Sequence, residues 1–423
     1  MPINNKRKNQ FPPSPPVKKQ KSDERLCLED TLSTLLKRNL PMDVVEHIDN
    51  LDENRLHNYS VLAYNVLAVN SNSSTESTIF RILNTNASEK EKLHAIDRFK
   101  ESLACGGGGA EKASRWVENF LRIPFGKYAV MGKKEPVSWL EESRKTLDNL
   151  VFGNKDVKQT ILEYVAKYIR NPLATSNVIC LHGEKGVGKT TIVGALSKIM
   201  NRPVVNIALG GIHKAEVLIG HDYTYVGSNY GKVVSGIIDS EVMNPIFAFD
   251  ELDKVARSGS DLSEVHSVLT HLVDPSQHGF NDLYMDGINF DMKKSIFIFT
   301  LNDLSKIDPI LLDRMVVINM KSYTTDEVQQ ITTDYTIPKI LKNYNLTKNE
   351  IIIPETFLKE VLLRTLEPGK LHGVRQIEHT FAKIIGRANY EMIRNNKKTL
   401  TIDNSYLESI PNKKEHVNYS MYT

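Results

Sequence analysis

The chain has 423 residues, more than one hydrophobic core usually organises, so we expect several folded units. Its 54 Lys and Arg nearly balance its 51 Asp and Glu, which argues against a broad nucleic-acid-binding surface. Cys27, Cys105 and Cys180 lie far apart without paired spacing, which argues against a disulfide framework or a cysteine metal site. No apolar run approaches the ~20 residues of a membrane span, and the N-terminus lacks the apolar core of a signal peptide. We therefore expect a soluble intracellular protein without membrane contact.

Residues 1–25 form a basic segment that we expect to be disordered. Two cationic clusters, Lys6-Arg7 and Lys18-Lys19-Gln20-Lys21, flank the prolines between residues 12 and 16. This layout is that of a bipartite nuclear-import signal, although an unspecialised solubilising tail accounts for it equally well. The sequence therefore leaves both the nucleus and the cytoplasm open as locations.

Residues 26–125 are predicted to be a helical N-terminal region, because apolar side chains recur with helical spacing in residues 32–51 and 93–120. A polar run at residues 70–78 and four glycines at residues 106–109 indicate flexible connectors. The glycines are not followed by the Lys-Ser/Thr pair of a phosphate loop, so the connector interpretation is favoured. The residues of this region do not indicate its function.

From about residue 126 apolar strands alternate with helices, which predicts an α/β domain with a parallel sheet over residues 126–335. The expected strands are residues 178–181, 204–207, 246–249, 295–300 and 316–320. Their nearly continuous apolar character is typical of strands covered on both faces. After residue 335 the strands cease, so we expect a smaller helical domain at 336–410 and a tail at 411–423.

The first of these strands leads directly into a phosphate-binding loop. Its residues are Gly183, Glu184, Lys185, Gly186, Val187, Gly188, Lys189 and Thr190, and helical spacing follows from Thr191 onward. The glycines let backbone N–H groups converge on phosphate oxygens, Lys189 reaches the terminal phosphates, and the Thr190 hydroxyl can ligate Mg²⁺. We therefore expect nucleotide binding here rather than a chance Gly-rich turn.

The third expected strand ends in two acids, Asp250 and Glu251. At the carboxyl end of a strand beside the phosphate loop, Asp250 is expected to hold Mg²⁺ and Glu251 to polarise the attacking water. Asp253 and Lys254 are expected to orient their neighbours. Adjacent acids are often only a solvated surface feature, but here a buried strand leads into them, which favours the functional interpretation.

Two further polar residues follow later strands. Asn302 comes just after the fourth strand, where its amide can sit between the two acids and hydrogen-bond the water or the γ-phosphate. Arg314 ends a short helix before the fifth strand, and a guanidinium suits the charge that develops during phosphoryl transfer. Taken alone, Asn302 would be an ordinary turn residue and Arg314 an exposed, ion-paired one.

Together and in this order, these motifs resemble the AAA+ ATPases, and residues 151–385 resemble the ATPase module of Lon proteases. The matching segments are Leu209-Gly210-Gly211, Ile219-Gly220-His221, Thr224-Tyr225-Val226-Gly227, Gly231-Lys232-Val233, Asp250-Glu251-Leu252-Asp253-Lys254, Leu272-Val273-Asp274-Pro275, residues 311–315 and Gly373-Val374-Arg375. So many spaced matches over more than half the chain make the resemblance specific.

The resemblance implies an AAA+ P-loop three-layer domain with a five-stranded parallel sheet, followed by a helical lid domain. It identifies Lys189 and Thr190 as Walker A and Asp250 and Glu251 as Walker B. It also identifies Asn302 as sensor 1, Arg314 as the arginine finger and Arg375 as sensor 2. ATP and Mg²⁺ are the implied cofactors. Two further segments have implied roles, which are Phe152-Gly153 on the adenine side and Tyr225-Val226-Gly227 in a substrate-gripping pore loop.

The chain also departs from the family pattern. Glu184-Lys185 replaces the usual Pro-Pro, Asp222-Tyr223 stands where the family is commonly more basic, and Phe152 stands where Tyr is usual. No segment resembles the nucleophile loop of the Lon peptidase. We therefore expect a Lon-like ring, a homo-hexamer, that unfolds or remodels protein substrates by ATP hydrolysis without a proteolytic domain of its own.

Several alternatives stay open at this stage. The chain could be an ATPase subunit that works with a separate peptidase, a nucleic-acid-directed AAA+ motor, or a regulatory module that no longer hydrolyses ATP. The nearly neutral body argues against the second, and the presence of every hydrolytic group argues against the third. For Tyr225 the alternative is a packed core aromatic.

Overall fold

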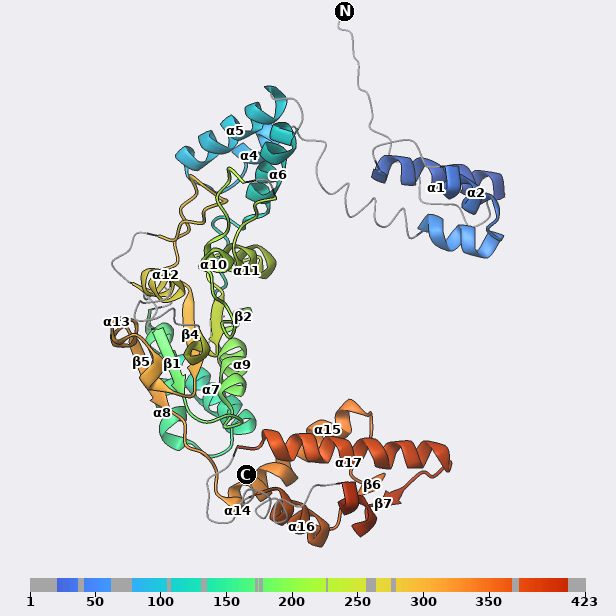
Figure 1. Ribbon diagram of the computed structural model, residues 1–423, viewed down its shortest axis with the longest axis vertical. Coiled ribbons are helices and arrows are strands. Elements are labelled where there is room, and N and C mark those ends of the chain that lie inside the picture. Colours follow the sequence, from blue (N-terminus) through green and yellow to red (C-terminus); the bar gives the residue numbers. More distant parts are fainter. Residues whose placement is uncertain are drawn as a thin grey trace, which may run out of the picture. The chain divides into compact units, whose positions relative to one another are not determined.

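The computed structural model describes residues 21–36, 42–61, 78–104, 108–130, 135–171, 174, 178–225, 227–255, 264–274, 279–366 and 373–409. The chain divides into two compact units, residues 1–85 and 86–423 (Figure 1). The helical region predicted for residues 26–125 is thus shared between two units rather than forming one. Within the described residues, none of the helices combines the length and the apolar character needed to cross a membrane.

The first unit is small and helical. It contains α1 (Lys21–Leu36), α2 (Met42–Asp49), a helix at residues 53–61 and α4 (Thr78–Leu83), with a core of Leu28, Ile48, Leu51 and Leu56. Arg25 pairs with Glu29 at 2.8 Å and with Asp49 at 2.6 Å, which ties the first part of α1 to α2. Residues 21–25 are therefore helical and not part of the expected disordered tail. Residues 1–20 of that tail lie outside the described residues.

The second unit opens with a helical hairpin made of α5 (Glu89–Ala104) and α6 (Gly108–Arg122). Trp116 and Phe120 of α6 are fully buried and stacked, with ring centroids 5.7 Å apart. Two more helices, α7 (Pro136–Leu150) and α8 (Lys155–Arg170), precede the first strand. The α/β alternation therefore begins with helices.

The sheet has five parallel strands, as predicted, and their order is β2-β3-β4-β1-β5. The strands are β1 (Val178–His182), β2 (Val204–Ala208), β3 (Ile246–Asp250), β4 (Ile296–Leu301) and β5 (Met315–Asn319). Their order is not the chain order, so helical crossovers connect them, which is typical of parallel sheets.

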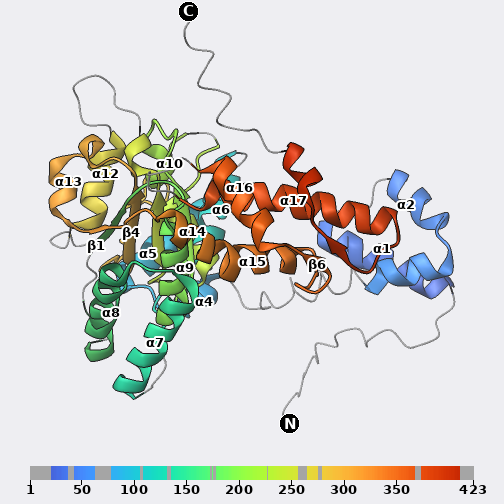
Figure 2. The ribbon, with the colours of Figure 1, turned by 90° about the horizontal axis from the view of Figure 1, so that it is seen from below.

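Helices cover both faces of the sheet. On one face, α7, α8 and α9 (Lys189–Met200) share a core with side chains from three strands. These side chains include Ile179 of β1, Ala248 of β3 and Ile298 of β4. On the other face, Phe249 and Phe299 stack at 4.9 Å on the side of α11 (Lys232–Ser240) and α12 (Glu264–Val273). Figure 2 shows the strands between these groups of helices, together with the short α10 (Glu216–Ile219) and α13 (Pro309–Asp313).

The helical domain begins earlier than predicted. A capping box of Thr324 and Glu327 starts α14 (Thr325–Ile331), and Tyr323 already belongs to the core of this domain. The boundary therefore lies near residue 323 and not at 336, because a local capping signal starts the first lid helix there.

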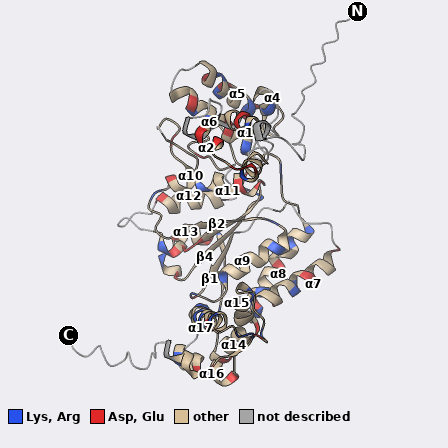
Figure 3. Cartoon of the chain, turned by 90° about the vertical axis from the view of Figure 1, so that its right-hand side faces the viewer, with Lys and Arg blue, Asp and Glu red and all other residues tan. Residues whose placement is uncertain are grey.

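The remaining elements of this domain are a π-helical segment (Thr332–Thr336), α15 (Ile337–Asn343), α16 (Glu355–Thr365), α17 (Arg375–Arg394) and a 3₁₀ segment (Asn404–Ser409). A two-stranded parallel sheet of β6 (Ile351–Ile352) and β7 (Leu400–Thr401) corrects the expectation that strands cease after residue 335. The expected tail at 411–423 lies outside the described residues. Figure 3 shows Lys and Arg interspersed with Asp and Glu along the helices, in keeping with the balanced composition.

Candidate active site

The phosphate-binding loop connects the end of β1 to the start of α9. Gly186 and Gly188 have φ angles of +86° and +97°, in the left-handed region that favours glycine. A Cβ added at Gly186 would lie 2.9 Å from the backbone nitrogen of Arg375, and the backbone N–H of Val374 donates to the Gly186 carbonyl at 3.1 Å. The loop glycine therefore also lets the start of α17 approach the site.

Lys189 lies at the centre of this loop. Its ammonium donates to the carbonyls of Gly183 at 2.5 Å and Glu184 at 3.0 Å and to Asn302 Oδ1 at 2.8 Å. Burial lowers the pKa of Lys189, and the positive charge of Arg375 adds to this effect while Asp250 opposes it. The two predicted residues Lys189 and Asn302 are thus direct neighbours.

The two acids lie at the carboxyl end of β3, as the sequence predicts. The parallel register places Thr300 of β4 beside Asp250, and the Thr300 hydroxyl donates to Asp250 Oδ1, which also accepts from the backbone N–H of Glu251 at 3.0 Å. Glu251 has a left-handed φ of +61° and forms an ion pair with Lys254. These contacts hold both carboxylates at the edge of the sheet.

Asn302 has a different set of neighbours from the one expected. Besides accepting from Lys189, its amide donates to Asp253 Oδ2 at 3.5 Å. It therefore lies between Lys189 and Asp253 rather than between Asp250 and Glu251. The parallel register is the reason, because the strand after β3 brings Thr300, and not Asn302, level with Asp250.

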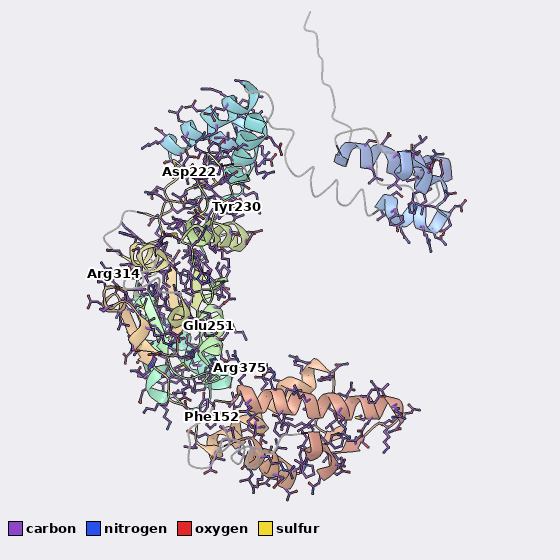
Figure 4. The ribbon with its side chains drawn as sticks, in the orientation of Figure 1. Phe152, Asp222, Tyr230, Glu251, Arg314 and Arg375 are labelled. Carbon is purple, nitrogen blue, oxygen red and sulfur yellow. The ribbon has the colours of Figure 1, made fainter. Side chains whose placement is uncertain are left out.

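One cavity of about 390 Å³ collects most of these groups. Its lining residues include Lys185, Gly186, Gly188, Lys189, Thr190, Thr191, Asp250, Glu251, Thr300, Asn302 and Arg375. Figure 4 shows Glu251 on the sheet domain and Arg375 at the start of α17. The site is therefore built from both the α/β domain and the helical domain.

Thr190 and Asp250 fit a Mg²⁺ ion that is bound together with nucleotide phosphates. The described residues contain no group of three His, Cys, Asp or Glu side chains that could hold a metal. The two side chains offer a hydroxyl and a carboxylate to this cavity, and Mg²⁺ commonly combines such a sparse set with substrate phosphate oxygens.

A second cavity of about 440 Å³ adjoins the first, and its lining includes the aromatic side chains of Phe152, Tyr323 and Tyr335. The Phe152 ring lies 6.4 Å from the rings of Tyr323 and Tyr335. The two cavities share the lining residues Gly188, Thr191, Lys339, Val374 and Glu378, so they form one cleft with a polar end and an aromatic end. Gly153, with φ +58°, turns the chain directly after Phe152.

Several residues of this cleft were missed by the sequence analysis. Thr300 carries a weak signal, since it is a polar residue near the end of an otherwise apolar strand. Tyr323, Tyr335, Lys339 and Glu378 carry no local signal, because only the docking of the helical domain brings them to the cleft.

Arg314 lies away from these lining residues. Its guanidinium donates to Asp274 Oδ2 at 3.1 Å and to the Ile310 carbonyl at 2.9 Å. Neither described cavity of the cleft includes it. Within its own chain Arg314 is therefore partnered by Asp274 and does not reach the phosphate loop.

Tyr225 lies on a short loop that is closed by a backbone hydrogen bond from His221 N–H to the Asn229 carbonyl at 3.1 Å. Its side chain is 67% exposed, which excludes the packed-core alternative. Gly227 has φ +79° and open space around its Cα, while Val226 lies outside the described residues.

Comparison with known proteins identifies a family to which this part of the chain is similar. A model of the ATPase family associated with various cellular activities (AAA) matches residues 179–323. The Lon protease of Helicobacter pylori (strain J99 / ATCC 700824) is 32% identical over 319 residues, which cover 73% of this chain and 37% of that protein. The peroxisomal Lon protease homolog 2 of Zea mays is 36% identical over 296 residues, which cover 70% of this chain and 32% of that protein.

The Lon protease of Campylobacter jejuni is 31% identical over 333 residues, which cover 77% of this chain and 41% of that protein. The chain thus spans about a third of the length of the curated relatives it matches. The matched region, the five-stranded parallel sheet and the geometry of the cleft agree. The chain therefore carries an ATPase domain of the AAA family and shares this module with the Lon proteases.

Proposed function

We propose that this chain hydrolyses ATP in the cleft and uses the energy to unfold or remodel protein substrates as part of a homo-hexameric ring. The observation that carries the proposal is the convergence of Lys189, Glu251 and Arg375 on one cavity that continues into an aromatic one. This combination suits a base at one end and a chain of phosphates at the other.

The residues of the cleft divide the work of hydrolysis. Lys189 stabilises negative charge on the terminal phosphates, and Glu251 accepts a hydrogen bond from the attacking water and polarises it. Asn302, held by Lys189 and Asp253, orients groups at the γ-phosphate. Mg²⁺ held by Thr190 and Asp250 supplies further charge stabilisation when bound.

Arg375 connects hydrolysis to motion of the helical domain. It begins α17, and the neighbouring Val374 is hydrogen-bonded to the phosphate loop. A guanidinium at this point senses the charge of the terminal phosphate, so loss of that phosphate weakens the contact between the domains. The helical domain then acts as the lid that moves during turnover.

Protein substrates are proposed on the basis of Tyr225 and the similarity to Lon proteases. Its exposed ring on a glycine-containing loop suits transient contact with an extended polypeptide. In this function the cleft residues hydrolyse ATP, Tyr225 pulls the substrate, and none of these residues cleaves peptide bonds. Any cleavage of the substrate is assigned to a separate peptidase.

The first prediction tests hydrolysis with two variants of the cleft. Lys189→Ala should abolish nucleotide binding, whereas Glu251→Gln should keep binding and lower the hydrolysis rate by about a hundredfold or more. Calorimetric titration with ATP and a phosphate-release assay measure the two effects. Equal hydrolysis by the wild-type protein and Glu251→Gln would contradict the assignment.

Stimulation of ATP hydrolysis by casein or by DNA distinguishes a protein remodeller from a nucleic-acid-directed motor. Unfolded casein should stimulate hydrolysis and stay uncut in a preparation free of other proteases. Strong stimulation by single-stranded or duplex DNA, with none by casein, would replace the protein remodeller by the nucleic-acid motor. Proteins retained by Glu251→Gln with ATP would identify the natural substrates.

A further inference from the structure

The ring of Tyr223, two residues before Tyr225, lies against two cations from the helical hairpin. The guanidinium carbon of Arg98 is 4.0 Å from the ring centre, and the ammonium of Lys112 is 4.4 Å from it. Arg98 belongs to α5 and Lys112 to α6, so each helix contributes one cation. Both distances lie in the range where the negative face of an aromatic ring attracts a cation.

The Arg98 side chain is held firmly in this position. It donates to Asp286 at 2.6 Å and to Glu101 at 3.0 Å, and it is only 15% exposed. Burial disfavours its charge, but the two carboxylates outweigh this effect and raise the pKa of Arg98. A fixed, permanently charged group therefore lies against the Tyr223 ring.

The hairpin itself is seated on the segment that follows Asp282. The indole N–H of Trp116 donates to the Tyr284 carbonyl at 3.0 Å, and the Tyr284 ring lies 6.0 Å from the Tyr223 ring. At the other end, the Asn289 backbone N–H donates to Glu91 of α5 at 3.2 Å. Figure 4 places Asp222 and Tyr230, which flank the loop, between the hairpin and the sheet.

The turn between Tyr223 and Tyr225 is tight. Asp222 accepts from the Thr224 backbone N–H at 2.7 Å through its side chain and from the Tyr225 N–H at 3.2 Å through its carbonyl. The Ser228 hydroxyl donates to the Tyr223 carbonyl at 3.4 Å. Because these bonds close the turn, a shift of Tyr223 displaces the exposed Tyr225.

We propose that Tyr223 is the positioning residue of the loop that carries Tyr225, and that its ring is held against Arg98 and Lys112 so that this loop and the α5–α6 hairpin move together. The role of Tyr225 in this inference rests on the proposed function. A basic side chain at position 223 would be repelled by the two cations, whereas a tyrosine ring is attracted to them. The aromatic residue at this position therefore suits the hairpin of this particular chain.

The experiment compares Tyr223→Leu with Tyr223→Phe, which keeps the ring, and with Lys112→Gln. Two quantities are measured in the full chain. The first is the ATP hydrolysis stimulated by casein, and the second is the hydrogen exchange of residues 220–231. In Tyr223→Leu the stimulation by casein should fall roughly fivefold and the hydrogen exchange of the loop should become faster. In Tyr223→Phe both quantities should stay within about twofold of the wild-type values. Lys112→Gln should fall between them.

Lys100→Gln is the matched control, because Lys100 is an exposed cation of α5 that pairs with Asp97. It should leave both readouts unchanged. Equal damage by Tyr223→Phe and Tyr223→Leu would overturn the proposal, as would unchanged exchange in Tyr223→Leu. If Tyr223→Leu fails to fold, wild-type exchange and stimulation in Lys112→Gln would overturn it instead.

The two readouts separate this inference from the proposed function. If casein fails to stimulate even the wild-type protein while loop exchange changes as expected, the anchoring of the loop is supported and the proposed substrate class is wrong. If casein stimulates every variant equally and exchange is unchanged, the anchoring is wrong and the proposed function stands.

Discussion

At the scale of single residues, the position of the Glu251 side chain depends on Gly210, a glycine in the segment that follows β2. A Cβ added to Gly210 would lie 2.5 Å from Glu251 Oε2, closer than non-bonded atoms approach. The Leu209 backbone N–H donates to the Asp250 carbonyl at 2.9 Å, which keeps the two segments together. The absence of a side chain at Gly210 therefore leaves the room that the Glu251 carboxylate occupies.

We predict that Gly210→Ala lowers the rate of ATP hydrolysis by roughly tenfold while ATP affinity stays within about twofold. The reason is that the new methyl group displaces a carboxylate that acts on water and not on the bound phosphates. Steady-state hydrolysis and calorimetric ATP titration measure the two quantities.

Gly194→Ala is the control for this substitution. Gly194 lies within α9, and an added Cβ there meets no atom within 4 Å. This variant should keep full activity and gain about 0.5 to 1 kcal/mol of stability, because alanine favours a helix over glycine. Wild-type hydrolysis by Gly210→Ala would show that Glu251 does not use this space.

At the scale of elements, a buried carboxylate joins the loop of Tyr225 to the segment beneath the hairpin. Asp282 is 2% exposed and accepts from the backbone N–H groups of Gly231 at 2.8 Å, Tyr284 at 2.9 Å and Met285 at 3.1 Å. Burial raises the pKa of Asp282 from 3.8 to about 6, although the three donors and the charge of His221 favour the carboxylate. Protonation of Asp282 therefore changes the contact between the loop of Tyr225 and the segment beneath the hairpin.

This shift predicts a pH dependence of stability with a definite sign. Because the folded pKa of Asp282 exceeds its unfolded value, its contribution to stability is fully present below about pH 4. It is lost as the pH rises through about 6, and its size is about 2 to 3 kcal/mol. Asp282→Asn cannot titrate, so the stability of the variant relative to the wild type should rise between pH 4 and pH 7.

Denaturant unfolding of both proteins at several pH values measures this difference. Other carboxylates titrate in the same range, but they are common to both proteins and cancel in the comparison. Any constant loss from the altered hydrogen bond to Gly231 is independent of pH. A difference that stays flat from pH 4 to pH 7 would show that Asp282 titrates normally.

At the scale of the whole molecule, the surroundings of Arg314 bear on the proposed ring. Arg314 does not line the cleft of its own chain, and Ile310 and Val316 beside it are 55% and 44% exposed. Val316 lies on β5, which is an edge strand, so among the described residues no further strand lies beside it. These features suit contact with a neighbouring copy, in whose cleft Arg314 would meet the bound nucleotide.

We predict complementation between two inactive variants. Arg314→Ala subunits keep the phosphate loop, and Lys189→Ala subunits keep the arginine, so a mixed interface can hold both. An equal mixture should recover roughly a quarter of the wild-type hydrolysis, because random assembly forms the productive pairing at about one interface in four.

Hydrolysis assays and light scattering on the mixtures test this prediction. Arg387→Ala, which removes an exposed arginine paired with Glu391 on α17, serves as the control and should be active without mixing. A monomer with full activity, or mixtures no more active than their components, would rule out the ring.

The sequence alone determined those parts of the site that depend on local patterns. The glycines around Lys189, the apolar strand before Asp250 and Glu251, and the five strands are encoded by neighbouring residues, because backbone conformation and strand burial are short-range properties. The comparisons confirmed the family that these motifs indicate. The assigned roles of the individual site residues remain predictions.

Only the tertiary structure decided which distant residues complete the site. Thr300 meets Asp250 through strand register, and Tyr323 and Tyr335 join Phe152 through docking of the helical domain. The contact of Tyr223 with Arg98 was likewise absent from any local pattern, whereas the start of the helical domain carries a local signal in the capping box of Thr324 and Glu327. Such contacts join residues far apart in the chain, so their geometry follows from packing and not from the spacing of amino acids.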